Sequence, residues 1–276
     1  HPAARANAAI LVAFSNPHVA ELLLRGTAGA AGLPPALRKV AFIAGPASHG
    51  KGEHEWDKDA RLLQQCLDAS KNAGDFETAL YVNGWPESPD ALDDAATVVV
   101  LSDGLDGHPL AKPERREKMR ALMDRGCGLV CLHYAVAAPP DDRPLWHEWL
   151  GGYWERGYSE NPINTVEVAP AAPEHPICRG WAPFTAKDEF YYRIRFREND
   201  PRRTAIMTAM LPKDAPKKET VAWAIERANG GRSFGFTGGH YHENWRIDPF
   251  RKMVLNAIVW SAKGDVPEEG TASSVE

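Results

Sequence analysis

Between residues 38 and 135, short apolar runs alternate with amphipathic segments, and this alternation constrains the fold more than any other feature of the sequence. The apolar runs, rich in Val, Leu, Ile and Phe, are found at 39–45, 76–82, 97–103 and 128–135. Segments with helical spacing of apolar residues lie between them at 55–72 and 113–126, and a shorter helix is expected at 89–95. Apolar strands joined by helices predict a parallel sheet flanked by helices on both faces.

The half of the chain that follows is richer in strands. Runs with strand character lie at 164–170, 188–196, 203–211, 219–227 and 232–239, and a helix is expected at 249–262. We therefore predict an α/β fold with a β-rich insert in its C-terminal half. The predicted organisation is an N-terminal segment (1–36) that is helical or partly disordered, one domain (38–263) and a flexible tail (264–276).

The composition argues against a nucleic-acid or membrane protein. The 276 residues carry a net charge of −5, and the basic residues are dispersed. No apolar run is long enough to span a bilayer. The Gly-rich loop at 45–56 matches neither GxxxxGK[ST] nor GxGxxG, so no nucleotide cofactor is expected. Because the sequence begins at His1, a cleaved signal peptide would not be visible, and the compartment stays open between cytoplasmic and periplasmic or secreted.

Histidines gather where the predicted strands end. The side chains that follow these strands include His49, His54, Asp103, His133, His240 and His242. These five histidines and His108 make six of the ten in the chain. Because ligands in an open α/β sheet bind beyond the carboxyl ends of its strands, we expect these side chains to lie at one edge of the sheet.

Such a convergence predicts a site for a divalent metal, with zinc as the first choice because imidazole nitrogen is one of its usual ligands. The candidate ligands are His49, His54, His133, His240 and His242. In an extended segment, His240 and His242 would point to the same side. No HExxH or CxxC motif is present, so other roles stay open. The histidines could act directly as acid and base, or His54 could cap a helix and His133 could fill the core.

Several motifs together resemble the ThuA-like family, named for trehalose utilisation. They are KVAFIAGPASHGKGEHEW, GLVCLHYAV, LGGYWE, DEFYYRIRF and GGHYHENW with FRKMVLNAIVWSA, in this order across residues 38–263. The resemblance implies a fold like that of class I glutamine amidotransferases, which is flavodoxin-like. It also implies a link to the uptake and breakdown of disaccharides, often beside sugar dehydrogenases that make 3-keto sugars.

The amidotransferase comparison places His133 where those enzymes have a nucleophilic cysteine, and His240 where they have the catalytic histidine. Cys131 comes two residues too early and is expected to point into the strand. The resemblance therefore implies that glutaminase activity is absent. An amidotransferase that uses Cys131 is kept only as a third hypothesis.

The leading hypothesis is an enzyme that acts on a disaccharide, a glycoside or a 3-keto sugar. Its predicted catalytic residues are His133, His240 and Glu189, although Glu189 could instead form a salt bridge with Arg193. Candidate substrate-binding residues are Asp103, Tyr134, Tyr191, Tyr241 and Trp245. The alternative is a non-catalytic sugar-binding or assembly protein that keeps the pocket. Exposed aromatic residues in the insert also suggest a homodimer.

Overall fold

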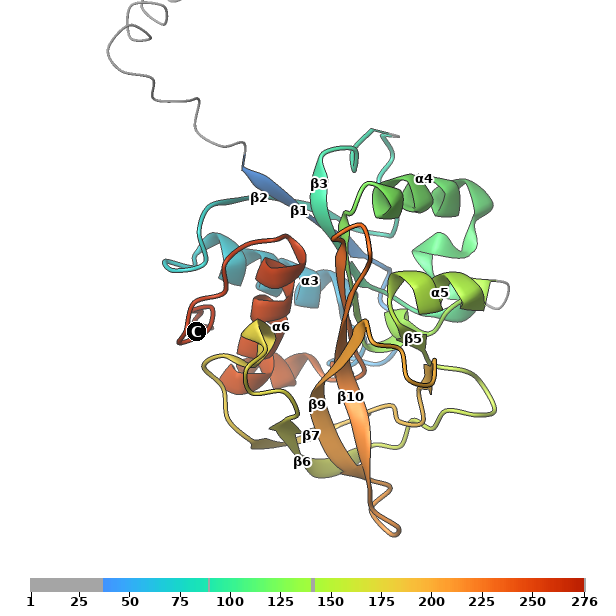
Figure 1. The fold of residues 1–276 in the computed structure, drawn as a ribbon, viewed down its shortest axis with the longest axis vertical. Coiled ribbons are helices and arrows are strands. Elements are labelled where there is room, and N and C mark those ends of the chain that lie inside the picture. Colours follow the sequence, from blue (N-terminus) through green and yellow to red (C-terminus); the bar gives the residue numbers. More distant parts are fainter. Residues whose placement is uncertain (1–36, 89, 140–141, 276) are drawn as a thin grey trace, which may run out of the picture. The chain divides into compact units, whose positions relative to one another are not determined.

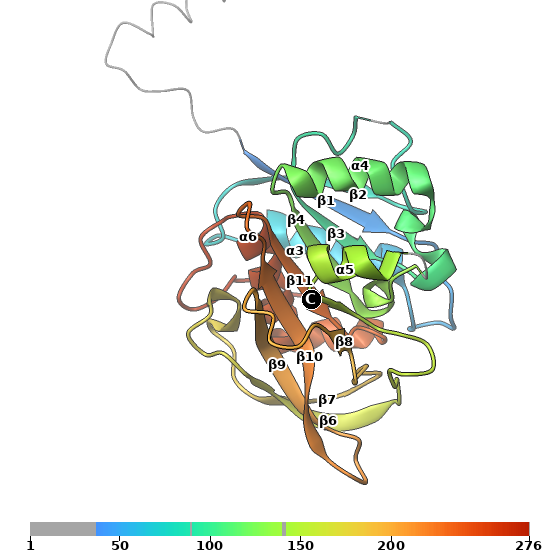
Figure 2. The same cartoon turned by 45° about the vertical axis from the view of Figure 1, so that its right-hand side comes forward.

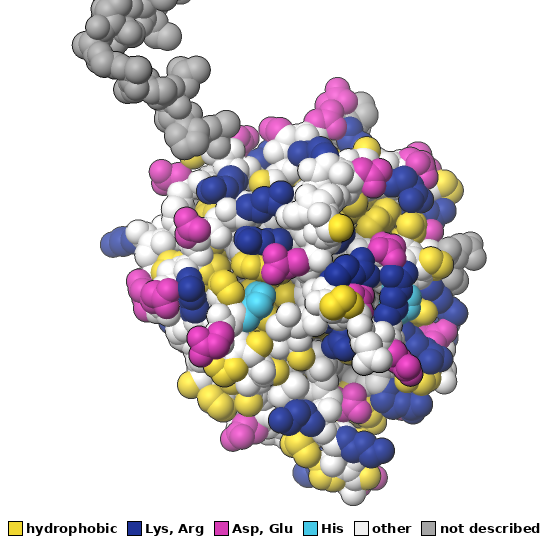
Figure 3. All heavy atoms as spheres, viewed as in Figure 1, with side chains coloured by type: hydrophobic (Ala, Val, Ile, Leu, Met, Phe, Trp, Pro, Cys, Tyr) yellow, Lys and Arg dark blue, Asp and Glu magenta, His cyan; other side chains and the backbone are white. Residues whose placement is uncertain are grey.

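The computed structural model describes residues 37–88, 90–139 and 142–275 (Figure 1). The prediction for residues 1–36 lies outside these described residues. Among them, no helix is long and apolar enough to cross a membrane. On the face drawn in Figure 3, acidic and basic side chains are intermixed, as the near-balanced charge of the sequence leads one to expect.

A nine-stranded sheet forms the centre of the fold, with the strand order β2-β1-β3-β4-β11-β10-β9-β6-β7. Its parallel part consists of β1 (Arg38–Ala44), β2 (Phe76–Tyr81), β3 (Ala95–Leu101), β4 (Gly128–Leu132) and β11 (Arg232–Phe236). The predicted parallel sheet is thus present. The helix predicted at 89–95 is not found among the described residues, because residues 90–94 form turns.

The β-rich insert extends the same sheet in antiparallel fashion. Its strands are β6 (Asn164–Pro170), β7 (Phe184–Asp188), β9 (Arg203–Leu211) and β10 (Lys217–Glu226). Two short strands, β5 (Gly152–Tyr153) and β8 (Arg195–Phe196), pair separately. The hairpin of β9 and β10 reaches past β6 and β7 at the lower end of Figures 1 and 2.

Helices cover both faces of the parallel part (Figure 2). They are α3 (Trp56–Asp68), α4 (Pro113–Asp124), α5 (Arg143–Trp149) and α6 (Asp248–Ser261). Alternate residues of β1 point to opposite faces, so Val40 and Phe42 pack with α3 and α6, whereas Ala41 and Ile43 pack with α4 and α5. Burial on both faces explains why β1, β3 and β4 consist mostly of apolar residues.

Residues 264–275 lie against helices α3 and α6, in contrast to the flexible tail that their polar composition predicted. The side chain of Thr271 is fully buried. Its backbone N–H donates to Asn256 Oδ1 at 2.7 Å, and Asn72 Nδ2 donates to the carbonyl of Gly270 at 3.0 Å. Polar side chains from α6 and from the loop after α3 therefore hold this segment, which hydrophobic patterning does not detect.

The run at 188–196 was predicted as one strand, but only its two ends belong to strands. β7 ends at Asp188, β8 begins at Arg195, and Arg193 between them has φ +55°. An isolated bridge joins Tyr192 to Glu160. The segment between β7 and β8 leaves the sheet and crosses its carboxyl edge, where the candidate site lies.

Candidate functional site

His133 is the first residue after β4 and begins a 3-10 turn, η3 (His133–Val136). Its φ of +50° lies in the left-handed region, which is uncommon for a residue with a side chain. A sharp turn between strand and helix lifts the side chain above the carboxyl edge of the sheet, as the nucleophile turn does in α/β hydrolases. His133 is nevertheless fully buried, because other loops close over it.

His54 comes from the loop between β1 and α3 and also has a left-handed backbone, with φ +46°. Its N–H donates to the carbonyl of His240 at 3.1 Å, and the N–H of His242 donates to the carbonyl of Gly52 at 2.9 Å. These bonds, with the bridge between Glu53 and Tyr241, tie the first loop to the loop after β11. Residues almost two hundred positions apart in sequence therefore share one site.

A buried carboxylate, Asp188, holds the loop that carries His240. It accepts hydrogen bonds from the N–H groups of Gly239 at 2.8 Å and His240 at 3.0 Å. It also accepts from the N–H of Glu189 at 2.7 Å and from Asn244 Nδ2 at 3.1 Å. Asp188 thus fixes the backbone of both His240 and Glu189.

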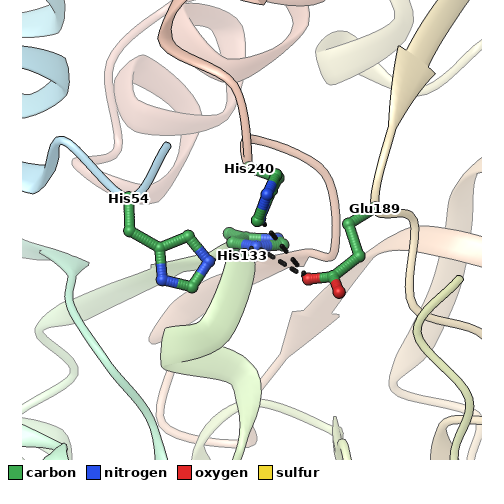
Figure 4. A group of neighbouring side chains, drawn as sticks. All are labelled: His54, His133, Glu189 and His240. Atoms are coloured by element: carbon green, nitrogen blue, oxygen red, sulfur yellow. Dashed lines mark hydrogen bonds and ion pairs between the residues drawn. The ribbon is translucent and has the colours of Figure 1, made fainter. Parts of the chain in front are cut away.

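His54, His133, His240 and Glu189 converge from four segments, and their ligating atoms lie within 4.8 Å of one another (Figure 4). The Nε2 atoms of His54 and His133 are 3.1 Å apart. Glu189 Oε2 is 3.5 Å from His133 Nε2 and 3.5 Å from His240 Nδ1. We call these four residues the histidine cluster.

The hydrogen-bond partners assign the tautomers of two of these histidines. His133 Nδ1 lies 2.7 Å from the carbonyl oxygen of Thr237, which only accepts, so Nδ1 carries the hydrogen. Ser48 Oγ donates to Asp103 Oδ1 at 2.6 Å and is 3.1 Å from His54 Nδ1, so Nδ1 of His54 donates as well. Both Nε2 atoms then present lone pairs to each other.

Facing lone pairs call for a proton or a cation between or beside them. The Tyr191 hydroxyl, 3.2 Å from His133 Nε2, can donate to one of them. The His240 Nδ1 atom is buried and has no hydrogen-bond partner among the described residues. Unpartnered buried nitrogens are costly, typically about 1–3 kcal/mol each, so the cluster is unfavourable as it stands.

Protonation of His54 or His240 does not relieve this arrangement near neutral pH. Burial lowers the pKa of His54 to about 4, and burial together with the neighbouring His133 lowers the pKa of His240. Burial opposes ionisation of Glu189, but its contacts with His133 and His240 outweigh this and lower the pKa of the carboxyl group. His54 and His240 are therefore neutral imidazoles beside a carboxylate, which is the state that binds a metal.

The geometry fits a metal ion. Two nitrogens bound to one tetrahedral zinc at about 2.0–2.1 Å lie roughly 3.3 Å apart, close to the 3.1 Å between His54 and His133. The outer nitrogen of each ring donates to an oxygen acceptor, as is usual for metal-binding histidines. The cluster could therefore hold a metal ion.

A second group of possible ligands adjoins the first through His54. It consists of His49, His54 and Asp103, of which His49 is exposed. Asp103 Oδ1 is 3.5 Å from His54 Nδ1 and accepts from Trp56 Nε1 at 3.3 Å. Asp103, predicted to bind substrate, is thus placed to orient His54.

His242, predicted as a ligand, lies apart from the histidine cluster. Its Nδ1 is 2.5 Å from the buried Asp59, and this hydrogen bond raises the pKa of His242. The prediction assumed an extended HYH segment, but a 3-10 turn, η6 (His242–Arg246), begins at His242 and turns its ring away. His240 is thus in the cluster and His242 is not.

The aromatic residues predicted to bind substrate divide into three groups. Tyr191 is buried at the cluster, and Tyr134 is half-buried beside it, with its ring centroid 6.4 Å from that of Tyr191. Tyr241 lies at the rim, where its ring meets that of His240. Trp245 is only 1% exposed and packs on Phe250, so it belongs to the core.

Some residues of the site were missed in the sequence. Asp188 and Thr237 act from behind the cluster, and neither carries a motif. Glu53, in contrast, was visible in the sequence beside His54; it is half-exposed, and its Oε1 lies 3.8 Å from His240 Nε2. Glu189 does not pair with Arg193, which contacts Glu160 instead.

The thiol of Cys131 is not available for catalysis. It is fully buried within β4, and burial raises the pKa of the thiol. A nucleophilic cysteine requires the thiolate form and an exposed position, so this geometry disfavours the amidotransferase hypothesis.

Comparisons with known proteins agree with this fold. The family model ThuA, described as trehalose utilisation, matches residues 47–261, whereas no curated protein matches the sequence. A ThuA-like protein from Parabacteroides merdae is 20% identical, with 87% of this chain and 98% of that chain covered and a TM-score of 0.60. A ThuA-like protein from Bacteroides uniformis is 15% identical, with 84% and 95% covered and a TM-score of 0.57.

A third similar structure is Agd3, titled a carbohydrate deacetylase. It is 14% identical, with 82% of this chain but only 32% of that chain covered and a TM-score of 0.52. The ThuA-like structures confirm the expected fold of the class I glutamine amidotransferase-like type. Because the family model spans most of its length, the chain belongs to the ThuA family.

Proposed function

We propose that this protein is a metal-dependent enzyme that acts on a carbohydrate. The observation that carries the proposal is the pair of facing Nε2 lone pairs of His54 and His133, with the unpartnered Nδ1 of His240 beside them. Three imidazole nitrogens within 4.8 Å of one another, two of which present lone pairs to each other, favour a bound cation over a structural role.

His54, His133 and His240 are the proposed ligands, and zinc is the first choice for a site rich in imidazole. Catalytic zinc sites use three protein ligands and keep a further position open for water or substrate. Glu189 then serves as the acid/base rather than as a fourth ligand. Its other oxygen, Oε1, accepts from Asn161 Nδ2 at 3.0 Å, which orients the carboxylate.

The residues of the chain suit proton transfer at a sugar. The lowered pKa of Glu189 makes it a base at neutral pH, with Oε2 facing the cluster. Burial raises the pKa of Tyr191 well above its usual value, so its hydroxyl remains a hydrogen-bond donor. A divalent metal bound here would polarise a carbonyl or hydroxyl oxygen of the substrate.

Family membership supports a carbohydrate as the substrate, because the family is described by trehalose utilisation. The similarity to a protein titled a carbohydrate deacetylase is compatible with this choice, although at 14% identity it concerns the fold alone. Within carbohydrates, a 3-keto sugar fits a base beside a polarised carbonyl, because the hydrogen next to the carbonyl is acidified. A disaccharide or glycoside of that kind is our proposed substrate.

The first experiment measures bound metal by mass spectrometry in protein purified without a histidine tag. We expect one metal per chain in the wild type and loss of metal in His133→Ala and His240→Ala. His242→Ala is the matched control, because His242 is a neighbour of His240 but is bonded to Asp59, and it should keep the metal. A wild type without metal, or equal loss in the control, would refute the metal site.

A second measurement separates the roles of Glu189. Glu189→Gln keeps the hydrogen bond from Asn161 through its amide oxygen but cannot accept a proton. If Glu189 is the acid/base, this variant binds metal normally and loses turnover of 3-keto disaccharides by about 100-fold or more. Sugar binding that survives both His133→Ala and chelation, without turnover in the wild type, would instead favour the sugar-binding protein.

A further inference from the structure

A groove of about 750 Å³ lies beside the histidine cluster, on the side of the insert. Its polar lining comes from three segments: the loop before β6 and the first residue of β6 give Glu160, Asn161 and Asn164, the crossing segment gives Tyr192, and the tip of the β9–β10 hairpin gives Lys213 and Asp214. We call it the hairpin groove. Its volume falls within the roughly 300–1,000 Å³ typical of small-molecule sites.

The hairpin groove is one side chain away from the proposed acid/base. Asn161 lines the groove and donates from Nδ2 to Glu189 Oε1 at 3.0 Å. Glu189 Oε2 in turn lies 3.5 Å from His133 and 3.5 Å from His240. A ligand that fills the groove therefore ends next to the group that would move a proton.

The crossing segment connects the two places along its backbone. Tyr191 contacts His133, whereas the next residue, Tyr192, lines the groove, as expected where consecutive side chains point to opposite sides. Reciprocal backbone hydrogen bonds of 3.1 and 3.0 Å between Glu160 and Tyr192 fasten this segment to the loop before β6. The spacing between cluster and groove is thus set by hydrogen-bonded backbone.

The chemistry of the groove suits a neutral polar ligand. Its charged residues are of both signs, and Glu160 already lies 3.4 Å from Arg193, so no excess of positive charge is present to bind a phosphate. Two side-chain amides, an exposed ammonium and an exposed carboxylate offer both donors and acceptors. Pro162, Pro212 and Tyr192 add apolar wall, which fits the C–H face of a sugar ring.

We propose that the hairpin groove binds the second sugar unit of a disaccharide whose first unit lies at the histidine cluster. The proposal rests on the proposed function and narrows the substrate class, since a substrate bound at both the histidine cluster and the hairpin groove must contain two linked sugar units. The insert then determines substrate size, and Asn161 links recognition of the second unit to the position of Glu189.

The test compares the binding of a disaccharide with that of a monosaccharide by titration calorimetry. Trehalose and cellobiose are the disaccharide probes, and glucose is the monosaccharide probe. The variants Asn164→Ala and Lys213→Ala remove polar groups of the groove without touching Glu189. Lys218→Ala is the matched control, because it is an exposed lysine on the same hairpin that lines a different hollow.

We expect Asn164→Ala and Lys213→Ala to weaken binding of at least one disaccharide by about 3- to 10-fold each, as for the loss of one hydrogen bond. Glucose binding should change less than twofold, and Lys218→Ala should match the wild type. Equal affinities in all variants, an equal loss for glucose, or no disaccharide binding to the wild type would each overturn the proposal.

Metal content measured on the same samples keeps the two proposals apart. A wild type that binds metal but no disaccharide overturns the groove assignment and leaves the metal centre standing. If the wild type contains no metal but binds a disaccharide, and Lys213→Ala binds that disaccharide more weakly than the wild type does, the metal centre is overturned and the groove assignment is supported.

Discussion

The carboxylate of Asp188 offers the sharpest test of how this fold builds its site. Each of its oxygens accepts two hydrogen bonds: Oδ1 from the N–H groups of Glu189 and His240, and Oδ2 from the N–H of Gly239 and from Asn244 Nδ2. The side chain is fully buried, so water cannot replace these bonds. Asp188→Asn keeps the shape but turns one acceptor oxygen into a donor.

The expected cost follows from this geometry. Two of the four donors would face an NH₂ group, and hydrogen bonds to charged groups contribute about 1.5–3 kcal/mol each. The free energy of unfolding should therefore fall by about 3–6 kcal/mol. For a domain of this size, about 3 kcal/mol lowers the Tm by roughly 6–12 °C. Metal affinity should fall as well, because the backbones of His240 and Glu189 lose their common anchor.

Urea denaturation and thermal unfolding of wild type and variant measure this cost. Asp57→Asn is the control, because Asp57 is half-exposed and its contact with Arg61 at 2.9 Å is a surface ion pair worth about 0–1 kcal/mol. If Asp188→Asn loses no more stability than Asp57→Asn, the argument that Asp188 clamps the two segments is refuted.

Three further predictions follow from the same structure. Asp103→Ala should weaken metal binding about 10- to 100-fold, measured by competition with a chelator, because Asp103 orients His54 from behind. Trp245→Ala should cost about 3–5 kcal/mol of unfolding free energy, whereas Trp245→Phe should leave sugar affinity unchanged, since this ring is core and not a sugar platform. The free energy of unfolding should fall as pH is lowered from about 6.5 towards 4. Burial lowers the pKa of His108 to about 3 and that of His175 to about 4. On acidification these two histidines therefore bind protons in the unfolded chain before they do so in the folded protein, which favours unfolding. Urea denaturation across this pH range should show a shallower dependence in His108→Asn, and an unchanged slope would contradict the assignment.

Much of the fold could be predicted because its strands carry a periodic signal. Strands β1, β3 and β4 are mostly buried and consist largely of apolar residues, so the parallel sheet and its carboxyl edge could be predicted. The segment 188–196 was misjudged for the same reason, since Phe, Tyr and Ile favour strands wherever they stand. Here they are needed to bury the crossing segment, and Phe190 and Tyr191 are both at most 3% exposed.

The sequence predicted which loops form the site, but it did not settle which side chains of those loops enter the histidine cluster. Topology brings the loops after β1, β4 and β11 to one edge, and that placed His54, His133 and His240 together. Which of His240 and His242 enters the cluster depends on a turn that begins at His242, and an alternation rule cannot foresee that turn. The role of Asp188 could not be predicted from the sequence, because this side chain accepts hydrogen bonds from backbone N–H groups, and no residue pattern encodes such contacts.

Backbone strain distinguishes the cluster from an ordinary buried histidine. His54 and His133 both have a left-handed φ, a conformation that costs a residue with a side chain on the order of 1–3 kcal/mol. His108 is equally buried, but it has φ −66°, its Nδ1 accepts from the N–H of Leu110 at 3.0 Å, and it belongs to neither group of ligands found among the described residues. A histidine that only fills the core is accommodated as His108 is, without strain or facing lone pairs. Strain at His54 and His133, together with their Nε2 lone pairs facing each other at 3.1 Å, is what a ligand would compensate, and this coincidence supports a metal site over a structural cluster.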